Sequence, residues 1–173
     1  ADAVALGKNL PRFSLPSDPG LTWSTFLGGA GNDYTEDVCI DGAGNVYVMG
    51  SSTDTWDSPR RAFSSGSDVF VAKLDSSGSL LWNTFLGGSG NDYSEGMTVD
   101  RAGNLYLAGD SAAGWGSPLR DYTAGWDVFV AKLDGSGDLT WSTFLGGSRS
   151  DFGGGVDVDG AGNVYVAGDS WGD

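Results

Sequence analysis

The chain has 173 residues, with 30 glycines, 12% aromatic and 18% charged residues, and a formal net charge of −14. So acidic a chain should be repelled by nucleic acid and by anionic lipid, and we expect neither as a partner. No run of 18 apolar residues occurs, so no membrane-spanning helix is predicted. Because the chain contains no histidine, a Ser-His-Asp or Cys-His catalytic site is excluded, and we expect no enzyme activity.

Residues 1–20 are predicted to form an N-terminal arm ahead of a folded domain at residues 21–173. Ala1–Leu6 weakly resembles a strand that recurs later, and a link from Pro11 to Pro19 follows it. The chain begins with Ala1-Asp2 rather than Met and shows no charged-then-apolar leader. A mature secreted form whose signal peptide was removed would begin in this way, and so would a cropped piece.

A period of 59 residues runs through the rest of the chain, as the spacing of Trp23, Trp82 and Trp141 shows. A fixed period of this size is typical of modules that bury their apolar faces by stacking on one another. Period-2 alternation and Gly/Asn turns predict four strands in the first full repeat. These predicted strands are residues 34–41, 45–52, 68–75 and 79–86.

Four short antiparallel strands, several of them apolar on both faces, are typical of a β-propeller blade, so the predicted fold is all-β. Nothing in the chain has the apolar period of a helix. We expect about three blades per chain, one of them split between the termini. The predicted units are complete blades at 34–86 and 93–145, a half-blade at 152–170, and an unpaired fourth strand at 22–27.

The recurring segments resemble a known family. W-S/N-T-F-L-G-G, G-N-D-Y, D-x-A-G-N-V/L-Y and D-V-F-V-A-K-L-D are similar to the SBBP β-propeller repeat of secreted and surface-exposed bacterial and archaeal proteins. The resemblance covers about residues 21–170. It implies a propeller fold and an extracellular location, and it implies no reaction because that family has no shared catalytic residues.

The split blade is the main indication of function. Three blades are too few to close a ring, which generally takes about four to eight, and a half-blade leaves an unpaired sheet edge. We therefore expect an extracellular structural protein that associates with itself head to tail, the N-terminal segment of one copy completing the blade of another. Donor residues are predicted to be Ala3, Val4, Ala5, Leu6, Trp23, Thr25, Phe26 and Leu27, and the acceptor edge Val164, Tyr165, Val166 and Ala167.

A filament is the preferred form of this assembly, and two alternatives stay open. Two copies could close a six-bladed ring, or the chain could be a fragment of a longer secreted propeller. A ring could also be a lectin-like module that binds glycans. Trp56, Trp115, Trp126 and Arg120 lie in the long connections and could stack on sugars. We favour the alternative, that each Trp covers its own blade or packs on a neighbouring subunit.

No cofactor is expected. Asp157–Asn163 alternates carboxylates with glycine as calcium loops do, but it lacks the closing bidentate Glu, so structural calcium is a minor alternative. We expect Asp41, Asp100 and Asp159 to cap the turn between the first two strands of each blade. Cys39 is the single cysteine, and its repeat counterparts are Thr and Asp, which indicates an inert packed thiol.

Overall fold

The computed structural model describes residues 23–171. The predicted N-terminal arm at 1–20, with the donor residues Ala3, Val4, Ala5 and Leu6, lies outside these residues. Ten strands make up the described part. They are β1 (Asp33–Ile40), β2 (Val46–Ser52), β3 (Asp68–Leu74), β4 (Leu80–Leu86), β5 (Asp92–Val99), β6 (Leu105–Ser111), β7 (Asp127–Leu133), β8 (Leu139–Leu145), β9 (Asp151–Val158) and β10 (Val164–Ser170).

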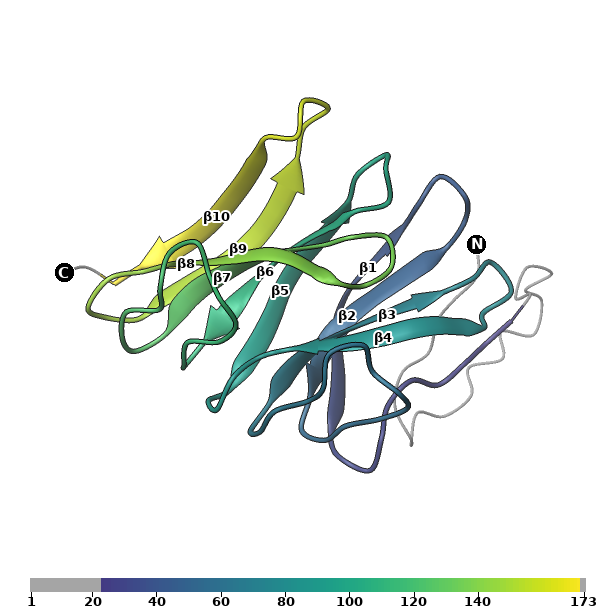
Figure 1. The fold of residues 1–173 in the computed structure, drawn as a ribbon, viewed down its shortest axis with the longest axis horizontal. Helices are drawn as coiled ribbons and strands as arrows, with labels where there is room; N and C mark the ends of the chain where they lie inside the picture. The colour runs from purple at the N-terminus through teal and green to yellow at the C-terminus, as the bar shows by residue number, and fades with distance from the viewer. Residues whose placement is uncertain (1–22, 172–173) are drawn as a thin grey trace, which may run out of the picture.

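The strands form three antiparallel sheets that follow one another along the chain. Blade 1 has the order β1-β2-β3-β4, blade 2 has the order β5-β6-β7-β8, and the half-blade pairs only β9 with β10. Figure 1 shows the sheets side by side, with the half-blade at one end and blade 1 at the other. The prediction of an all-β fold built from propeller blades is confirmed. Between residues 23 and 171 no helix is long and apolar enough to cross a membrane.

A recurring aspartate shapes the tight turn between the first two strands of each blade. The Asp41 carboxylate accepts the backbone N–H groups of Ala43 and Asn45, both at 2.9 Å. Gly44 closes the turn with a φ of 83°, a conformation that glycine adopts without steric strain. The carboxylates of Asp100 and Asp159 accept the equivalent bonds in the next two repeats, so their predicted capping role is confirmed.

The core lies between the sheets, because each complete blade is apolar on both faces. Every residue of β2 and of β6 is buried. One cluster joins Val69 and Leu86 of blade 1 to Phe129 and Phe144 of blade 2. The other face of blade 1 packs against Leu27, which precedes the first strand. Blade stacking is therefore what buries these side chains.

The residues that were predicted as a fourth strand, 22–27, form no strand in the part that is described, 23–27. A strand is defined by ladder hydrogen bonds, and no third strand lies beside this segment among the described residues. Its side chains nevertheless occupy the positions that fourth-strand side chains occupy in the complete blades. The ring of Trp23 lies against Gly78, as that of Trp82 lies against Gly137 one blade further on.

Gly109→Ala tests the close contact between the first two strands of blade 2. A Cβ at Gly109 would collide with the carbonyl oxygen of Tyr93 and would lie 2.6 Å from Phe129 Cε1. We expect the free energy of unfolding to fall by about 2–3 kcal/mol, since strands in a sheet cannot separate locally without losing packing. Urea unfolding measures this change. Gly42→Ala is the control, because a Cβ at Gly42 would meet nothing within 4 Å. Equal stabilities of the two variants would contradict the packing.

Candidate functional site

One end of the stack carries a groove beside the exposed strand β10. The groove has a volume of about 510 Å³ and is lined by Val128 and Leu145 of blade 2 and by residues 166–170 of β10. In blade 1 the equivalent positions, Val69 and Leu86, pack against the third and fourth strands of blade 2. The groove therefore occupies the place where the half-blade would carry its own third and fourth strands.

The predicted acceptor residues lie on β10 and are open to solvent. Val164 and Val166 are half-buried, whereas Tyr165 and Ala167 are exposed. Tyr165 is 59% exposed, while its counterpart Tyr47 is fully buried. β10 pairs with β9 along one side, and its other side has no partner strand among the described residues.

The opposite end of the stack exposes the complementary positions. Val38 of β1 is 56% exposed, whereas its counterpart Met97 in blade 2 is 7% exposed because it packs against blade 1. Phe26 is 57% exposed, although Phe144 at the same repeat position is fully buried. Of the other predicted donor residues, Leu27 is buried against blade 1, and Trp23 donates its indole N–H to the Ser76 carbonyl at 3.1 Å. Thr25 is half-buried.

The contact between blades 1 and 2 shows what a complete junction contains. Besides its apolar core, the Met97 N–H donates to the Asp37 carboxylate at 2.8 Å, and the Asp92 N–H donates to the Ser67 carbonyl at 2.6 Å. Gly153 of the half-blade donates in the same way to the Asp110 carboxylate of blade 2, at 2.6 Å. Polar groups thus fix how one blade is placed on the next.

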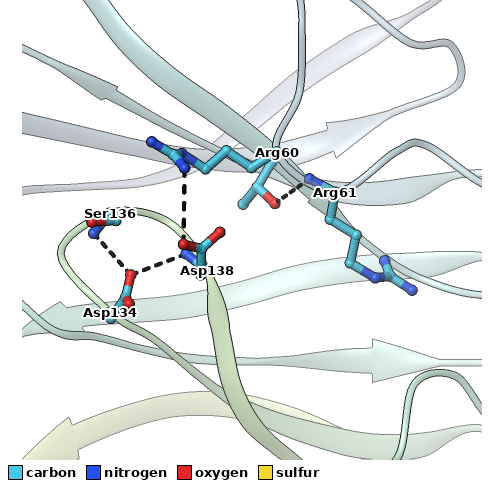
Figure 2. A network of polar contacts seen from close by, with 6 residues as sticks. Arg60, Arg61, Asp134, Ser136 and Asp138 are labelled. Carbon is cyan, nitrogen blue, oxygen red and sulfur yellow. Dashed lines mark hydrogen bonds and ion pairs between the residues drawn. The ribbon is translucent and has the colours of Figure 1, made fainter.

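Two arginines extend this junction. Arg61 binds the carbonyls of Phe85 and Gly87, each at 2.8 Å, and its guanidinium lies 5.5 Å from the ring centroid of Trp115 in the next repeat. Figure 2 shows Arg60 directed toward Asp138 in the turn between β7 and β8, with 3.8 Å between the charged groups. Because both side chains are exposed, this ion pair contributes at most about 1 kcal/mol. The apolar faces must supply most of the stability.

Buried carboxylates lie near the junction between successive blades. Asp92 is fully buried, and burial raises its pKa to about 6 even though the Ser111 hydroxyl and the Gly88 N–H donate hydrogen bonds to it. Burial also raises the pKa of Asp68, against hydrogen bonds from Ser64. Both carboxylates thus accept hydrogen bonds from neighbouring residues of the fold.

The glycan-stacking prediction is wrong for the two tryptophans of the long connections. Trp56 is buried edge-on against Phe70 and Phe85 of its own blade, with centroids 5.4 and 6.0 Å apart. Trp115 is buried in the same way in blade 2. The alternative, that each of these residues covers its own blade, is confirmed for both. Burying a large apolar ring against the face of a blade lowers the free energy relative to leaving it exposed to water.

Trp126 and Arg120 also contact other parts of the fold, although Arg120 is exposed and lines the groove beside β10. Trp126 is stacked between Tyr93, at 5.5 Å, and Phe152, at 6.4 Å between ring centroids. The Arg120 guanidinium donates to the carbonyls of Phe144 and Gly146, as Arg61 does one repeat earlier. A role for these two residues in glycan stacking stays a prediction.

The calcium alternative receives no support from the geometry. Asp159 of the predicted loop accepts hydrogen bonds from Ala161, Asn163 and Tyr165, which occupy both of its oxygens. Within residues 23–171 no group of three or more His, Cys, Asp or Glu side chains is placed to hold a metal ion. Cys39 is half-buried, and burial raises the pKa of its thiol to about 12, so it stays protonated.

The sequence analysis did not predict the exposed apolar side chains that lie at the two ends of the stack. Leu145 is 39% exposed, whereas Leu86 at the same position is fully buried, and Val38 and Ile40 are exposed at the other end. The signal was present in the 59-residue period. Any position whose counterpart is buried between two complete blades should be exposed at an unfinished end.

Comparison with known families agrees with this architecture. A family model for the SBBP β-propeller repeat matches the chain three times, at residues 22–55, 81–114 and 140–173, which together exceed half its length. Each match runs from the fourth-strand position of one blade through the first two strands of the next. A search of curated proteins finds no match to the chain.

The raised pKa of Asp92 predicts a pH dependence of stability with a defined sign. The folded-state pKa of Asp92, about 6, exceeds the ordinary aspartate pKa of 3.8, so the folded protein holds the proton more tightly between these two pH values. The stability that Asp92 contributes is therefore present below about pH 4 and is lost as pH rises through 6. Relative to Asp92→Asn, wild type should lose about 2 kcal/mol of unfolding free energy between pH 4 and pH 6.5, measured by urea unfolding.

Asp159→Asn is the control with the opposite sign. The hydrogen bonds from Asn163 lower the pKa of Asp159 to about 2, so its contribution is present above about pH 4 and is lost as pH falls toward 2. A constant difference between wild type and Asp92→Asn across pH 4–6.5 would show that Asp92 is not held protonated by burial.

Proposed function

The chain belongs to the SBBP β-propeller repeat family, and from that premise we propose that it is an extracellular, non-catalytic structural protein that polymerises head to tail. In the proposed filament, β9 and β10 of one copy combine with the N-terminal residues of the next copy to form one shared four-stranded blade. We propose an extracellular location because such repeats typically occur in secreted proteins. The partner is a second copy of the same chain.

One pair of repeat positions carries the proposal. Inside the chain, Leu86 of blade 1 and Phe144 of blade 2 belong to one core cluster, and both are fully buried. The same two positions recur as Leu145 beside the groove and Phe26 before β1, and both are exposed. One chain thus exposes, at opposite ends of its stack, the two positions that contact each other between blades 1 and 2. A second copy joined head to tail would restore this contact.

A second pair of positions supports the same register. Tyr47 of blade 1 and Met97 of blade 2 share the core cluster between the blades. Their counterparts are Tyr165 on β10 and Val38 on β1, again exposed at opposite ends. Both pairs are restored by the same head-to-tail placement of a second copy. This agreement favours a single defined junction over a nonspecific apolar contact.

The backbone of β10 supplies the rest of the junction. In blade 1, β2 pairs with β3 along its whole length, from Val46↔Leu74 to Ser52↔Asp68. The equivalent side of β10 would accept the third strand of the shared blade, for which Ala3–Leu6 of the next copy is our proposed donor. Residues 23–27 of that copy would lie outside it as the fourth strand.

A filament fits the chain better than a closed ring of two copies. A ring needs only the fourth-strand segment for closure, which would leave the arm ahead of it without a role. The contact is heterologous, since different surfaces of the two copies meet, and such contacts extend into filaments unless their rotation closes. A net charge of −14 would discourage sideways association of the polymer.

The direction of the contact is tested by blocking one end at a time. Leu145→Asp should block the tail of the stack and Phe26→Asp its head, because each places a charge in an apolar contact. Alone, neither variant should polymerise. Mixed in equal amounts, they retain one intact junction and should form a discrete dimer, which sedimentation velocity measures.

Leu81→Asp is the matched control, because the exposure of Leu81, 52%, lies between those of Leu145 and Phe26 but Leu81 is on the outer strand β4 rather than at an end face. This variant should assemble as wild type does. Mixtures of the two blocked variants that stay monomeric, while wild type polymerises, would contradict a head-to-tail junction. A wild-type chain that is monomeric at high concentration would reject self-assembly altogether.

Removal of residues 1–20 distinguishes the filament from the ring. The shortened chain keeps its fourth-strand segment but loses the proposed third strand, so we expect filaments to disappear and their critical concentration to rise at least about tenfold. Negative-stain electron microscopy of the full-length and shortened chains measures this. Closed rings formed equally well by both chains would reject the filament.

A further inference from the structure

Each complete blade carries a row of three side chains across its second, third and fourth strands. In blade 1, Tyr47 pairs with Lys73, which in turn pairs with Trp82. The Lys73 ammonium nitrogen lies 4.9 Å from the centroid of the Tyr47 ring, and the rings of Tyr47 and Trp82 are 6.2 Å apart. The cation is thus held against the face of the tyrosine.

Blade 2 repeats this row at the same three positions. Tyr106 pairs with Lys132, and Lys132 pairs with Trp141. The ammonium nitrogen is again 4.9 Å from the tyrosine centroid, and the two rings are 6.4 Å apart. In both blades the tyrosine hydroxyl donates to the aspartate of the adjacent turn. Two independent blades therefore build the same cation site.

The half-blade holds the first member of this row without the other two. Tyr165 is on β10, and its hydroxyl donates to Asp159 at 3.2 Å, as its counterparts do in the complete blades. Its ring is 59% exposed. Within residues 23–171 no lysine or arginine lies over it. The ring and the nearby carboxylate form a site for an organic ammonium group.

The sequence contains a single further lysine that could fill this site. The chain has only three lysines, Lys8, Lys73 and Lys132, and the last two occupy the rows of blades 1 and 2. Lys8 precedes Trp23, which holds the place of the fourth-strand tryptophan. The N-terminal part of the chain thus contains a lysine and a tryptophan, the two members of the row that the half-blade lacks.

We propose that Lys8 of a second copy binds over the ring of Tyr165 and completes the Tyr-Lys-Trp row of the shared blade. This inference rests on the proposed function and fixes the register of its junction, with Lys8 directly opposite Tyr165. Trp23 of a chain packs on its own blade 1, at the end of the stack away from its own β10 (Figure 1). The row of the half-blade is therefore completed between copies.

The link between lysine and tryptophan is longer here than in the complete blades. Lys73 and Lys132 each stand nine residues before their tryptophan, whereas Lys8 stands fifteen residues before Trp23. The added length falls in the stretch that contains Pro11, Pro16 and Pro19. A longer connection between the third and fourth strands leaves the pairing of both strands unchanged, so the register of the row survives the insertion.

A double-mutant cycle on the single-junction dimer tests this contact. Lys8→Met is placed in the Leu145→Asp chain, which keeps its head, and Tyr165→Leu in the Phe26→Asp chain, which keeps its tail. Each change alone should raise the dissociation constant of the mixed dimer about 3- to 30-fold. The two together should raise it little further, because either one already removes the contact. Lys8→Arg should restore most of the affinity.

Arg12→Met is the matched control, since it removes another cation of the N-terminal segment and should show no coupling to Tyr165. Melting temperatures of the separate chains should stay unchanged, which verifies that each variant folds. A dimer that forms with independent, multiplying effects of Lys8→Met and Tyr165→Leu would overturn this register but leave head-to-tail assembly standing. If the blocked chains form no dimer, both proposals fail.

Discussion

A blade in this protein is a sheet that is apolar on both faces, so it is stable only between two other layers. The strands β2 and β6 are buried at every residue, because each lies inside a blade that is covered on both sides. β10 has a related sequence but is largely exposed, because its blade has only two strands among the residues that the structure describes. Burial is therefore set by a strand's position in the stack, and the blades at its two ends leave apolar positions exposed.

Polar contacts decide how one layer sits on the next. An apolar face alone would tolerate several placements, but the Met97 N–H needs the Asp37 carboxylate and the Gly153 N–H needs Asp110. A shifted blade would leave these groups unpaired at a half-buried interface, where a lost hydrogen bond to a charged group costs more than a neutral one. One backbone contact recurs at both junctions, since the Asp92 N–H donates to the Ser67 carbonyl and the Asp151 N–H to the Trp126 carbonyl, each at 2.6 Å. This recurrence makes a single register between copies reasonable.

Much of the fold could be predicted because the 59-residue period repeats each local signal. The observed strands agree with those predicted to within about a residue, and the Asp41 turn forms as its Asp-Gly-Ala-Gly-Asn sequence indicates. The partners of Trp56 and Trp126 could not be predicted residue by residue, because loop aromatics pack on whatever the tertiary fold brings near. Likewise, the exposure of Leu145 depends on which strands are missing, not on its own sequence neighbourhood.

The position of the break, inside a blade rather than between two blades, matters for the strength of the proposed filament. Blades within one chain are joined by the backbone, which gives each contact a high effective concentration that separate copies lack. A break between blades would leave only one apolar face to hold two copies together. A break inside a blade adds a strand ladder along β10 and apolar contacts on both faces of the shared blade, at Leu145 and at Val38. Dissociation would have to disrupt all three together, so such a junction should separate slowly and keep a defined polarity.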